Sequence, residues 1–130
     1  LWSCESLTNV DGLRNLTNLN ELDLDESTAL SNEFGLSNLT NHSMLSLEGC
    51  ISLTNVDGLS NLTNLTELDL WSCESLTNLD GLSGLTNLTS LNLSGCKSLS
   101  YFTIIRAKSL VSFRRIWHCF RELFSKKNNA

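Results

Sequence analysis

The sequence predicts a solenoid of the α/β type, with short parallel strands on a concave face and 3₁₀ or extended arms on the convex face. Two observations predict it: a 23-residue repeat, and two different apolar rhythms within each repeat. The repeat is marked by four triplets, Leu22-Asp23-Leu24, Leu45-Ser46-Leu47, Leu68-Asp69-Leu70 and Leu91-Asn92-Leu93. Such a period is typical of one supersecondary unit stacked on copies of itself, because a single unit cannot bury its own apolar face.

Each repeat is expected to begin with a strand. In the triplet at 68–70 the leucines alternate with Asp69, so they lie on one face of a strand, and Asp69, Glu67 and Trp71 lie on the other. Beyond the strand the apolar residues are spaced by three, at Cys73, Leu76, Leu79, Leu82, Leu85 and Leu88. Each step of three drifts by roughly 60° around an α-helix, so this spacing predicts a 3₁₀ or tight extended arm. Four glycines in register mark where the arms bend or pack closely: Gly12, Gly35, Gly58 and Gly81.

These residues resemble the leucine-rich repeat family. Its signature, L-x-x-L-x-L-x-x-N/C-x-L, is matched by Leu65, Leu68, Leu70 and Cys73, with Leu76 one place later than usual. The match covers residues 1 to about 103 and is similar to the internalin class with one residue inserted after the cysteine. The resemblance implies a horseshoe segment that binds protein along its concave face.

The second repeat, residues 25–44, departs from the pattern. Ser27 replaces the cysteine, Glu33 stands where other repeats have valine or leucine, and His42 takes a leucine position. Because a buried unpaired carboxylate is costly, we expect a local bulge that carries Glu33 to solvent, with Phe34 moving inward to compensate. His42 is expected to be a tolerated or partly exposed substitution without a ligand or catalytic role.

Four of the five cysteines fall at the same repeat position: Cys4, Cys50, Cys73 and Cys96. Successive turns would place Cys50, Cys73 and Cys96 in a column about 5 Å apart, which predicts a buried thiol ladder; adventitious disulfides and zinc are the alternatives. An unpaired ladder favours a reducing compartment such as the cytoplasm. A secreted or surface location stays open, because the chain has no initiating Met and is expected to begin inside a longer array.

Charge divides the chain into two parts. Residues 1–105, the repeat array of about four and a half repeats, carry a net charge of −11, and residues 106–130 carry +6. The overall charge of −5 hides this difference. The sequence has no apolar run of the length that spans a membrane, about 18 residues or more.

The candidate binding surface consists of equivalent residues on successive strands, which become neighbours on the open face of a parallel sheet. Three columns are predicted: Glu21, Met44, Glu67, Ser90; then Asp23, Ser46, Asp69, Asn92; then Trp2, Asp25, Glu48, Trp71, Ser94. Acids and tryptophans together suit a protein partner with a basic segment. The alternative is that the acids only keep an exposed sheet soluble. The negative charge of the face disfavours nucleic acid.

The tail, residues 106–130, follows a different rhythm. Its apolar residues lie within an arc of roughly 140° on a helix, and are Leu110, Phe113, Ile116, Trp117, Phe120, Leu123 and Phe124. This pattern predicts a basic amphipathic helix that caps the solenoid. Contact with a membrane surface or a helix-binding groove through residues 107–126, and a non-native tail, are the alternatives.

The sequence therefore favours a protein-interaction scaffold that binds through its concave face. No catalytic motif, cofactor-binding motif or metal-ligand spacing is present, so we expect no enzyme activity and no cofactor. The alternatives are a module that binds through its basic tail and a repeat fragment without a selected partner.

Overall fold

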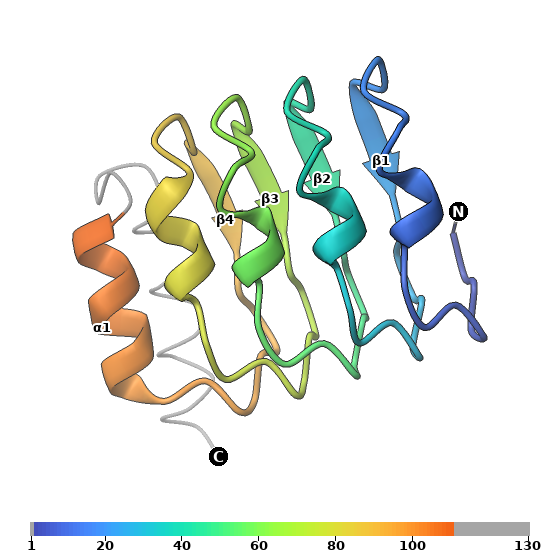
Figure 1. The fold of residues 1–130 in the computed structure, drawn as a ribbon. Helices are drawn as coiled ribbons and strands as arrows, with labels where there is room; N and C mark the ends of the chain where they lie inside the picture. The colour runs from blue at the N-terminus through green and yellow to red at the C-terminus, as the bar shows by residue number, and fades with distance from the viewer. Residues whose placement is uncertain (1, 111–130) are drawn as a thin grey trace.

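The structure is a computed structural model of the 130-residue chain, and it describes residues 2–110. Its two layers are a four-stranded parallel sheet, in the order β1-β2-β3-β4, and a row of 3₁₀ segments that faces it (Figure 1). The elements are η1 (Asp11–Leu13), β1 (Glu21–Asp23), η2 (Phe34–Leu36), β2 (Met44–Ser46), η3 (Asp57–Leu59), β3 (Glu67–Asp69), η4 (Asp80–Gly84), β4 (Ser90–Asn92) and α1 (Tyr101–Leu110).

The strands keep the 23-residue register. Leu22 pairs with Leu45, Leu45 with Leu68, and Leu68 with Leu91. The leucines of β2 to β4 are buried, while the flanking strand residues are exposed or half-buried. The predicted solenoid with strands on its concave face and 3₁₀ arms on its convex face is therefore confirmed.

Each 3₁₀ segment begins after an asparagine in the same repeat position. The side-chain oxygen of Asn55 accepts a hydrogen bond from the backbone amide of Asp57 at 3.0 Å, and Asn78 does the same for Asp80 at 2.7 Å. The equivalent bonds in the first two turns are made by Asn9 and Asn32. These bonds satisfy an amide that the short 3₁₀ segment leaves unpaired.

The glycines of the arms allow successive turns to touch. A Cβ at Gly35 would collide with the carbonyl oxygen of Val10, and one at Gly81 with that of Val56. At Gly58 a Cβ would lie 3.0 Å from the Cα of Phe34. Gly12, on the first described turn, has nothing within 4 Å of such a Cβ. The predicted close packing thus applies wherever a preceding turn is present.

The cysteines form the expected buried ladder. Cys50, Cys73 and Cys96 are fully buried free thiols, and each Sγ lies within hydrogen-bonding distance of a leucine carbonyl oxygen of the preceding turn, at 3.4, 3.2 and 3.0 Å respectively. Cys4, on the first turn, is half-buried. The ladder therefore ties adjacent turns together on the inside of the corner after each strand.

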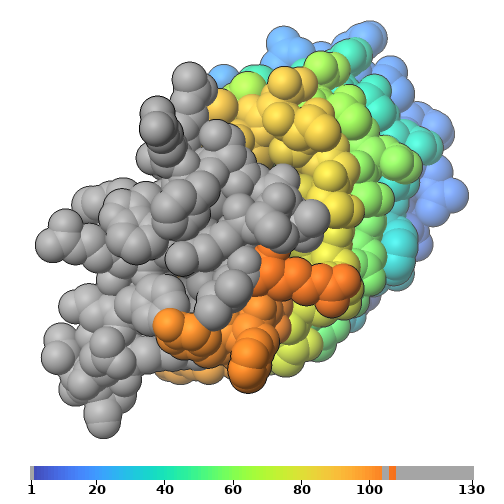
Figure 2. All heavy atoms as spheres, turned by 90° about the vertical axis from the view of Figure 1, so that its left-hand side faces the viewer, coloured from blue at the N-terminus to red at the C-terminus, as the bar shows by residue number. Residues whose placement is uncertain are grey.

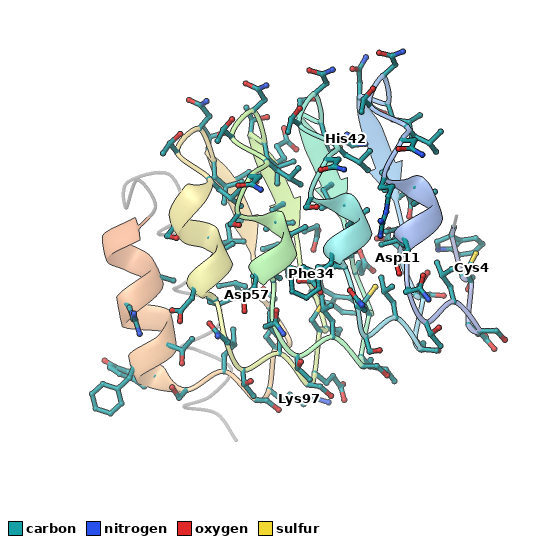
Figure 3. All side chains as sticks on the ribbon, in the orientation of Figure 1. Cys4, Asp11, Phe34, His42, Asp57 and Lys97 are labelled. Atoms are coloured by element: carbon teal, nitrogen blue, oxygen red, sulfur yellow. The ribbon has the colours of Figure 1, made fainter. Side chains whose placement is uncertain are left out.

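Two expectations for the second repeat are wrong. Glu33 is not carried to solvent: only 1% of it is exposed, and its Oε1 accepts a hydrogen bond from the backbone amide of Gly58 at 2.9 Å. Phe34 does not move inward: it begins η2 and is 55% exposed. Asp57, the equivalent residue at the start of η3, is exposed in the same way (Figure 3). The carboxylate reaches an unpaired amide of the next 3₁₀ segment, so the backbone needs no bulge.

His42 is also more buried than expected. Only 1% of it is exposed, and it lies inside the second turn (Figure 3). Its Nδ1 is 3.1 Å from the carbonyl oxygen of Leu39, whereas Nε2 has no hydrogen-bond partner among the described residues. Burial lowers the pKa of His42 below its usual value, with the bond to Leu39 acting in the opposite direction. The imidazole therefore fills a leucine position as a neutral group.

Helix α1 continues the 3₁₀ layer at the C-terminal end and packs against η4 (Figures 1 and 2). It begins at Tyr101, inside the stretch that the repeat pattern was expected to cover. Ala107 is buried in the contact, and Arg106 pairs with Asp80 of η4 at 3.6 Å. The apolar arc predicted at 113–124 lies outside the described residues. Within 2–110, no helix has the length and apolar character needed to cross a membrane.

Candidate protein-binding surface

The structure brings the first two predicted columns together on the sheet. Glu21, Met44, Glu67 and Ser90 are successive register partners, as are Asp23, Ser46, Asp69 and Asn92. The third column lies just beyond the strand ends, where backbone amides continue the ladder: Ser3 donates to Asp25, Glu26 to Glu48, and Gly49 to Trp71. Twelve of the thirteen predicted residues thus occupy one surface, which we call the concave face. The prediction is wrong for Ser94, which is buried with 4% of its surface exposed.

The second column has a structural role: its side chains accept hydrogen bonds that hold the turn after each strand. The side-chain oxygen of Asp23 accepts a hydrogen bond from the amide of Asp25, and that of Asp69 from the amide of Trp71. Asn92 makes the same bond to Ser94 at 3.0 Å. Because Asp and Asn both make this turn, the position selects a hydrogen-bond acceptor and not a negative charge.

Ser46 stands in the second column where the other repeats have aspartate or asparagine. Here the carboxylate of Asp25 accepts the hydrogen bond from the amide two residues further on, that of Glu48. The Ser46 hydroxyl donates to the Asp25 carboxylate, whose Oδ1 also accepts from the backbone amide of Glu48 at 3.0 Å. Burial raises the pKa of Asp25 above its usual value; the Ser46 bond lowers it, and the charge of Asp23 raises it again. Burial, followed by the charge of Asp25, raises the pKa of Glu48. Asp69, Glu26 and Asp23 also act on Glu48 through their charge, so negative charge is concentrated on the part of the face that β1 to β3 carry.

The first column carries the carboxylates that are free to meet a partner. Glu21 and Glu67 are exposed, and neither side chain makes a hydrogen bond or ion pair with another described residue. Met44 stands between them in register and is 43% exposed. Two tryptophans border the acids, Trp71 with 42% and Trp2 with 68% of its surface exposed. One methionine and two tryptophans therefore add exposed apolar area to an otherwise acidic face.

The concave face is hollowed between β2, β3 and β4. The hollow has a volume of about 190 Å³ and is lined by Met44, Leu45, Ser46, Glu67, Leu68, Asp69, Ser90 and Asn92. Six of these residues belong to the predicted columns. Leu45 and Leu68 contribute little surface to it, because their side chains face the core and are only 2% exposed. The hollow is therefore lined mainly by side chains of the first two columns.

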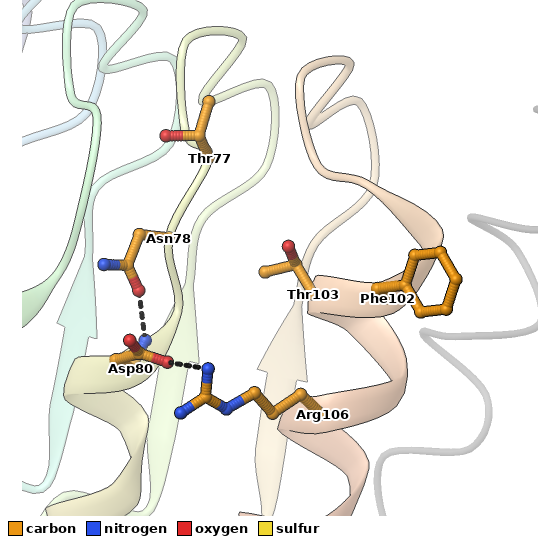
Figure 4. A pocket seen from close by; sticks show the side chains of 6 residues that line it. All are labelled: Thr77, Asn78, Asp80, Phe102, Thr103 and Arg106. Carbon is orange, nitrogen blue, oxygen red and sulfur yellow. Dashed lines mark hydrogen bonds and ion pairs between the residues drawn. The ribbon is translucent and has the colours of Figure 1, made fainter.

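A second hollow lies where α1 meets the last repeat (Figure 4). It has a volume of about 240 Å³ and is lined by Thr77, Asn78, Asp80, Phe102, Thr103 and Arg106. Phe102 is 82% exposed beside it. The repeat pattern does not predict this hollow, because the repeats were expected to extend to about residue 103. The change from leucine spacing to the Tyr-Phe pair at 101–102 was the available signal.

The described residues offer little for metal or thiol chemistry. Residues 2–110 contain no group of three acidic, histidine or cysteine side chains placed to hold a metal ion. Burial raises the pKa of the Cys50 thiol to about 12, and that of Cys96 to about 12. Burial also raises the pKa of Cys73, together with the neighbouring thiols. These thiols stay protonated at neutral pH, so they are poor nucleophiles and poor metal ligands.

Comparison with known proteins identifies the fold. No protein-family model and no curated protein matches the chain. An internalin (inlF) from Listeria monocytogenes has a similar solved structure, with a TM-score of 0.55 and 25% sequence identity over 82% of this chain. An internalin C2 (inlC2) from the same species gives a TM-score of 0.45 and 22% identity over 82% of this chain. The chain spans 40% and 55% of the two internalin chains. The parallel sheet, the 3₁₀ arms and the similarity to internalin identify this chain as a leucine-rich repeat solenoid.

Proposed function

We propose that this protein is a non-enzymatic interaction scaffold that binds a protein partner through its concave face. The observation that carries the proposal is an exposed group: Glu21, Met44 and Glu67 are in register on one sheet, and Trp71 lies just beyond the end of β3. The partner contributes a basic segment, because the free carboxylates attract lysine and arginine. Trp71 adds apolar area and a ring face for a cation.

The charge of the repeats supports this choice of partner. Residues 1–105 have 13 acidic residues and two basic ones, and four of the acids raise the pKa of Glu48 by their charge. A surface of this sign accelerates association with a basic protein and repels nucleic acid. Partners with a basic segment are therefore favoured over phosphate-bearing ligands.

The test uses the full chain and a fluorescein-labelled peptide rich in lysine, with a peptide in which glutamine replaces every lysine as the reference. Fluorescence anisotropy should show binding of the lysine peptide only. The double variant Glu21→Gln/Glu67→Gln and the single variant Trp71→Ala should each weaken it.

A matched control separates a specific surface from general attraction to an acidic protein. The variant Glu5→Gln/Asp57→Asn also loses two exposed carboxylates, but these lie outside the concave face. It should bind the lysine peptide as the parent protein does. Equal weakening in the two double variants would show that the concave face is not the binding surface.

A further inference from the structure

We propose that the partner segment bound by the concave face is an α-helix that lies across the strands. Its basic residues at positions i and i+7 meet Glu21 and Glu67, and an apolar residue at i+3 or i+4 between them meets Met44. This inference rests on the proposed function and specifies the conformation and side-chain spacing that the surface recognises.

The free groups of the concave face define the spacing. Most carboxylates of the second and third columns already accept hydrogen bonds from the protein, as Asp69 does from Trp71 and Asn92. The side chains of Glu21 and Glu67 make none with the described residues. Met44, the only methionine of the chain, pairs in register with both. Along the solenoid axis the first column therefore presents acid, methionine, acid, followed by the neutral Ser90 of β4.

An α-helix matches this pattern in both period and phase. Neighbouring strands lie about 4.8 Å apart, so Glu21 and Glu67 are separated by roughly 9.6 Å along the axis. Helix positions i and i+7 lie about 10.5 Å apart along the helix axis, and their directions differ by only about 20° around it. Positions i+3 and i+4 lie on that face at about 4.5 and 6 Å, above the strand that carries Met44.

Extended conformations match less well. In a β-strand, residues on the same face are about 6.7 Å apart, so no pair fits a separation of roughly 9.6 Å. A polyproline II segment does place i and i+3 on one face at about 9.3 Å. However, its intervening residues point about 120° away on either side, which leaves Met44 uncovered. The exposed methionine therefore distinguishes the α-helix from the polyproline II helix.

The width of the face also suits a helix. A helix has a diameter of about 10–12 Å with its side chains, and the first and third columns are four residues apart, or roughly 13 Å along a strand. A helix above the first two columns would cover the hollow of about 190 Å³, with Trp71 beside it. Ser90 and Asn92 give β4 a neutral surface, so the helix needs no basic residue above that strand.

The experiment compares four synthetic peptides against the full chain by isothermal titration calorimetry. The first is an alanine-based helix of roughly 20 residues, with lysines at i and i+7 and leucine at i+4. The second has the same composition with the lysines five residues apart, about 140° around the helix. The third is a polyproline II peptide with lysines at i and i+3, and the fourth is the first peptide with alanine in place of leucine.

The inference predicts that the first peptide binds about tenfold more tightly than the second and the third. Glu21→Gln/Glu67→Gln should remove this preference, and Glu5→Gln/Asp57→Asn should retain it. Met44→Ala should weaken the leucine peptide by about threefold and leave the alanine peptide unchanged, which measures their coupling directly.

Two outcomes overturn the inference in different ways. If the first and second peptides bind equally, or the polyproline II peptide binds best, binding as a helix is wrong, while the proposed binding of basic segments stands. If the lysine peptide of the anisotropy test binds no more tightly than its glutamine counterpart, the proposed function fails together with the inference.

Discussion

Replacement of Gly81 by alanine should destabilise the solenoid specifically, because this glycine lies where one turn packs on the next. A Cβ at this position would collide with the carbonyl oxygen of Val56 and lie 2.9 Å from the Cα of Asp57. Both contacts are with backbone atoms, so no side chain can rotate away to make room. The two turns must move apart at η4 while their strands remain hydrogen-bonded in the sheet.

The size of the effect follows from the packing. Overpacking a close-packed interior usually costs about 1–3 kcal/mol, and backbone collisions fall at the upper end because relief requires separation of whole turns. In a domain of this size each kcal/mol lowers the melting temperature by about 4–8 °C. We therefore expect Gly81→Ala to lower the melting temperature by about 10–20 °C.

Gly12→Ala is the matched control. Gly12 occupies the same repeat position and the same 3₁₀ geometry, but a Cβ added there would have nothing within 4 Å. Alanine at this position should be neutral or stabilising by about 0.5 kcal/mol, because it reduces the freedom of the unfolded chain. Circular dichroism melts of the two variants and the parent chain, at the same concentration and pH, measure the difference.

The comparison can refute the packing argument outright. If the two variants lose the same amount of stability, the cost comes from a general property of glycine in the 3₁₀ segment and not from contact between turns. If neither variant changes the melting temperature, the turns are not packed as closely as the structure has them.

Three further variants test other positions. His42→Leu should stabilise the protein by about 1–3 kcal/mol by removing an unpaired buried nitrogen. In the parent protein, His42 of the unfolded state binds a proton below pH 6.5, whereas His42 of the folded state, with its lowered pKa, does not. The free energy of unfolding should therefore decrease as the pH falls, and His42→Leu should abolish this decrease. Ser72→Gly should add about 0.5–1 kcal/mol in urea unfolding, because Ser72 has a φ of 56°. Cys119, which lies outside the described residues, is first replaced by serine. A thiol reagent should then modify the half-buried Cys4 before the buried Cys73, and similar rates would contradict the buried ladder.

The repeat architecture was predictable because it follows from spacing alone. A long run of leucines spaced strictly by three cannot stay on one face of an α-helix, and cysteines 23 residues apart must lie side by side once the coil forms. The glycine contacts followed for the same reason, since a residue without a side chain in every arm indicates close approach. Each of these inferences needs only the period and the sizes of the side chains.

The individual partners of polar groups were less predictable. Glu33 was expected in solvent because its partner, the backbone amide of Gly58, is not visible as a residue type in the sequence. The turn-forming role of the second column was concealed by charge, although the interchange of Asp69 with Asn92 at one repeat position already indicated an acceptor. Residue patterns predict which side chains are buried, whereas hydrogen-bond partners depend on the geometry of neighbouring turns.

The register of the cysteine ladder has a genetic consequence. Each thiol bonds a carbonyl oxygen one turn and three residues earlier, as Cys73 does to Leu47 and Cys96 to Leu70. A duplication or loss of 69 nucleotides, or 23 codons, therefore leaves every such contact with an equivalent partner. A change of 66 or 72 nucleotides, although it preserves the reading frame, leaves one turn a residue too long or too short, and that turn must absorb the difference in a loop. Recombination between copies that adds or removes whole turns keeps the ladder intact.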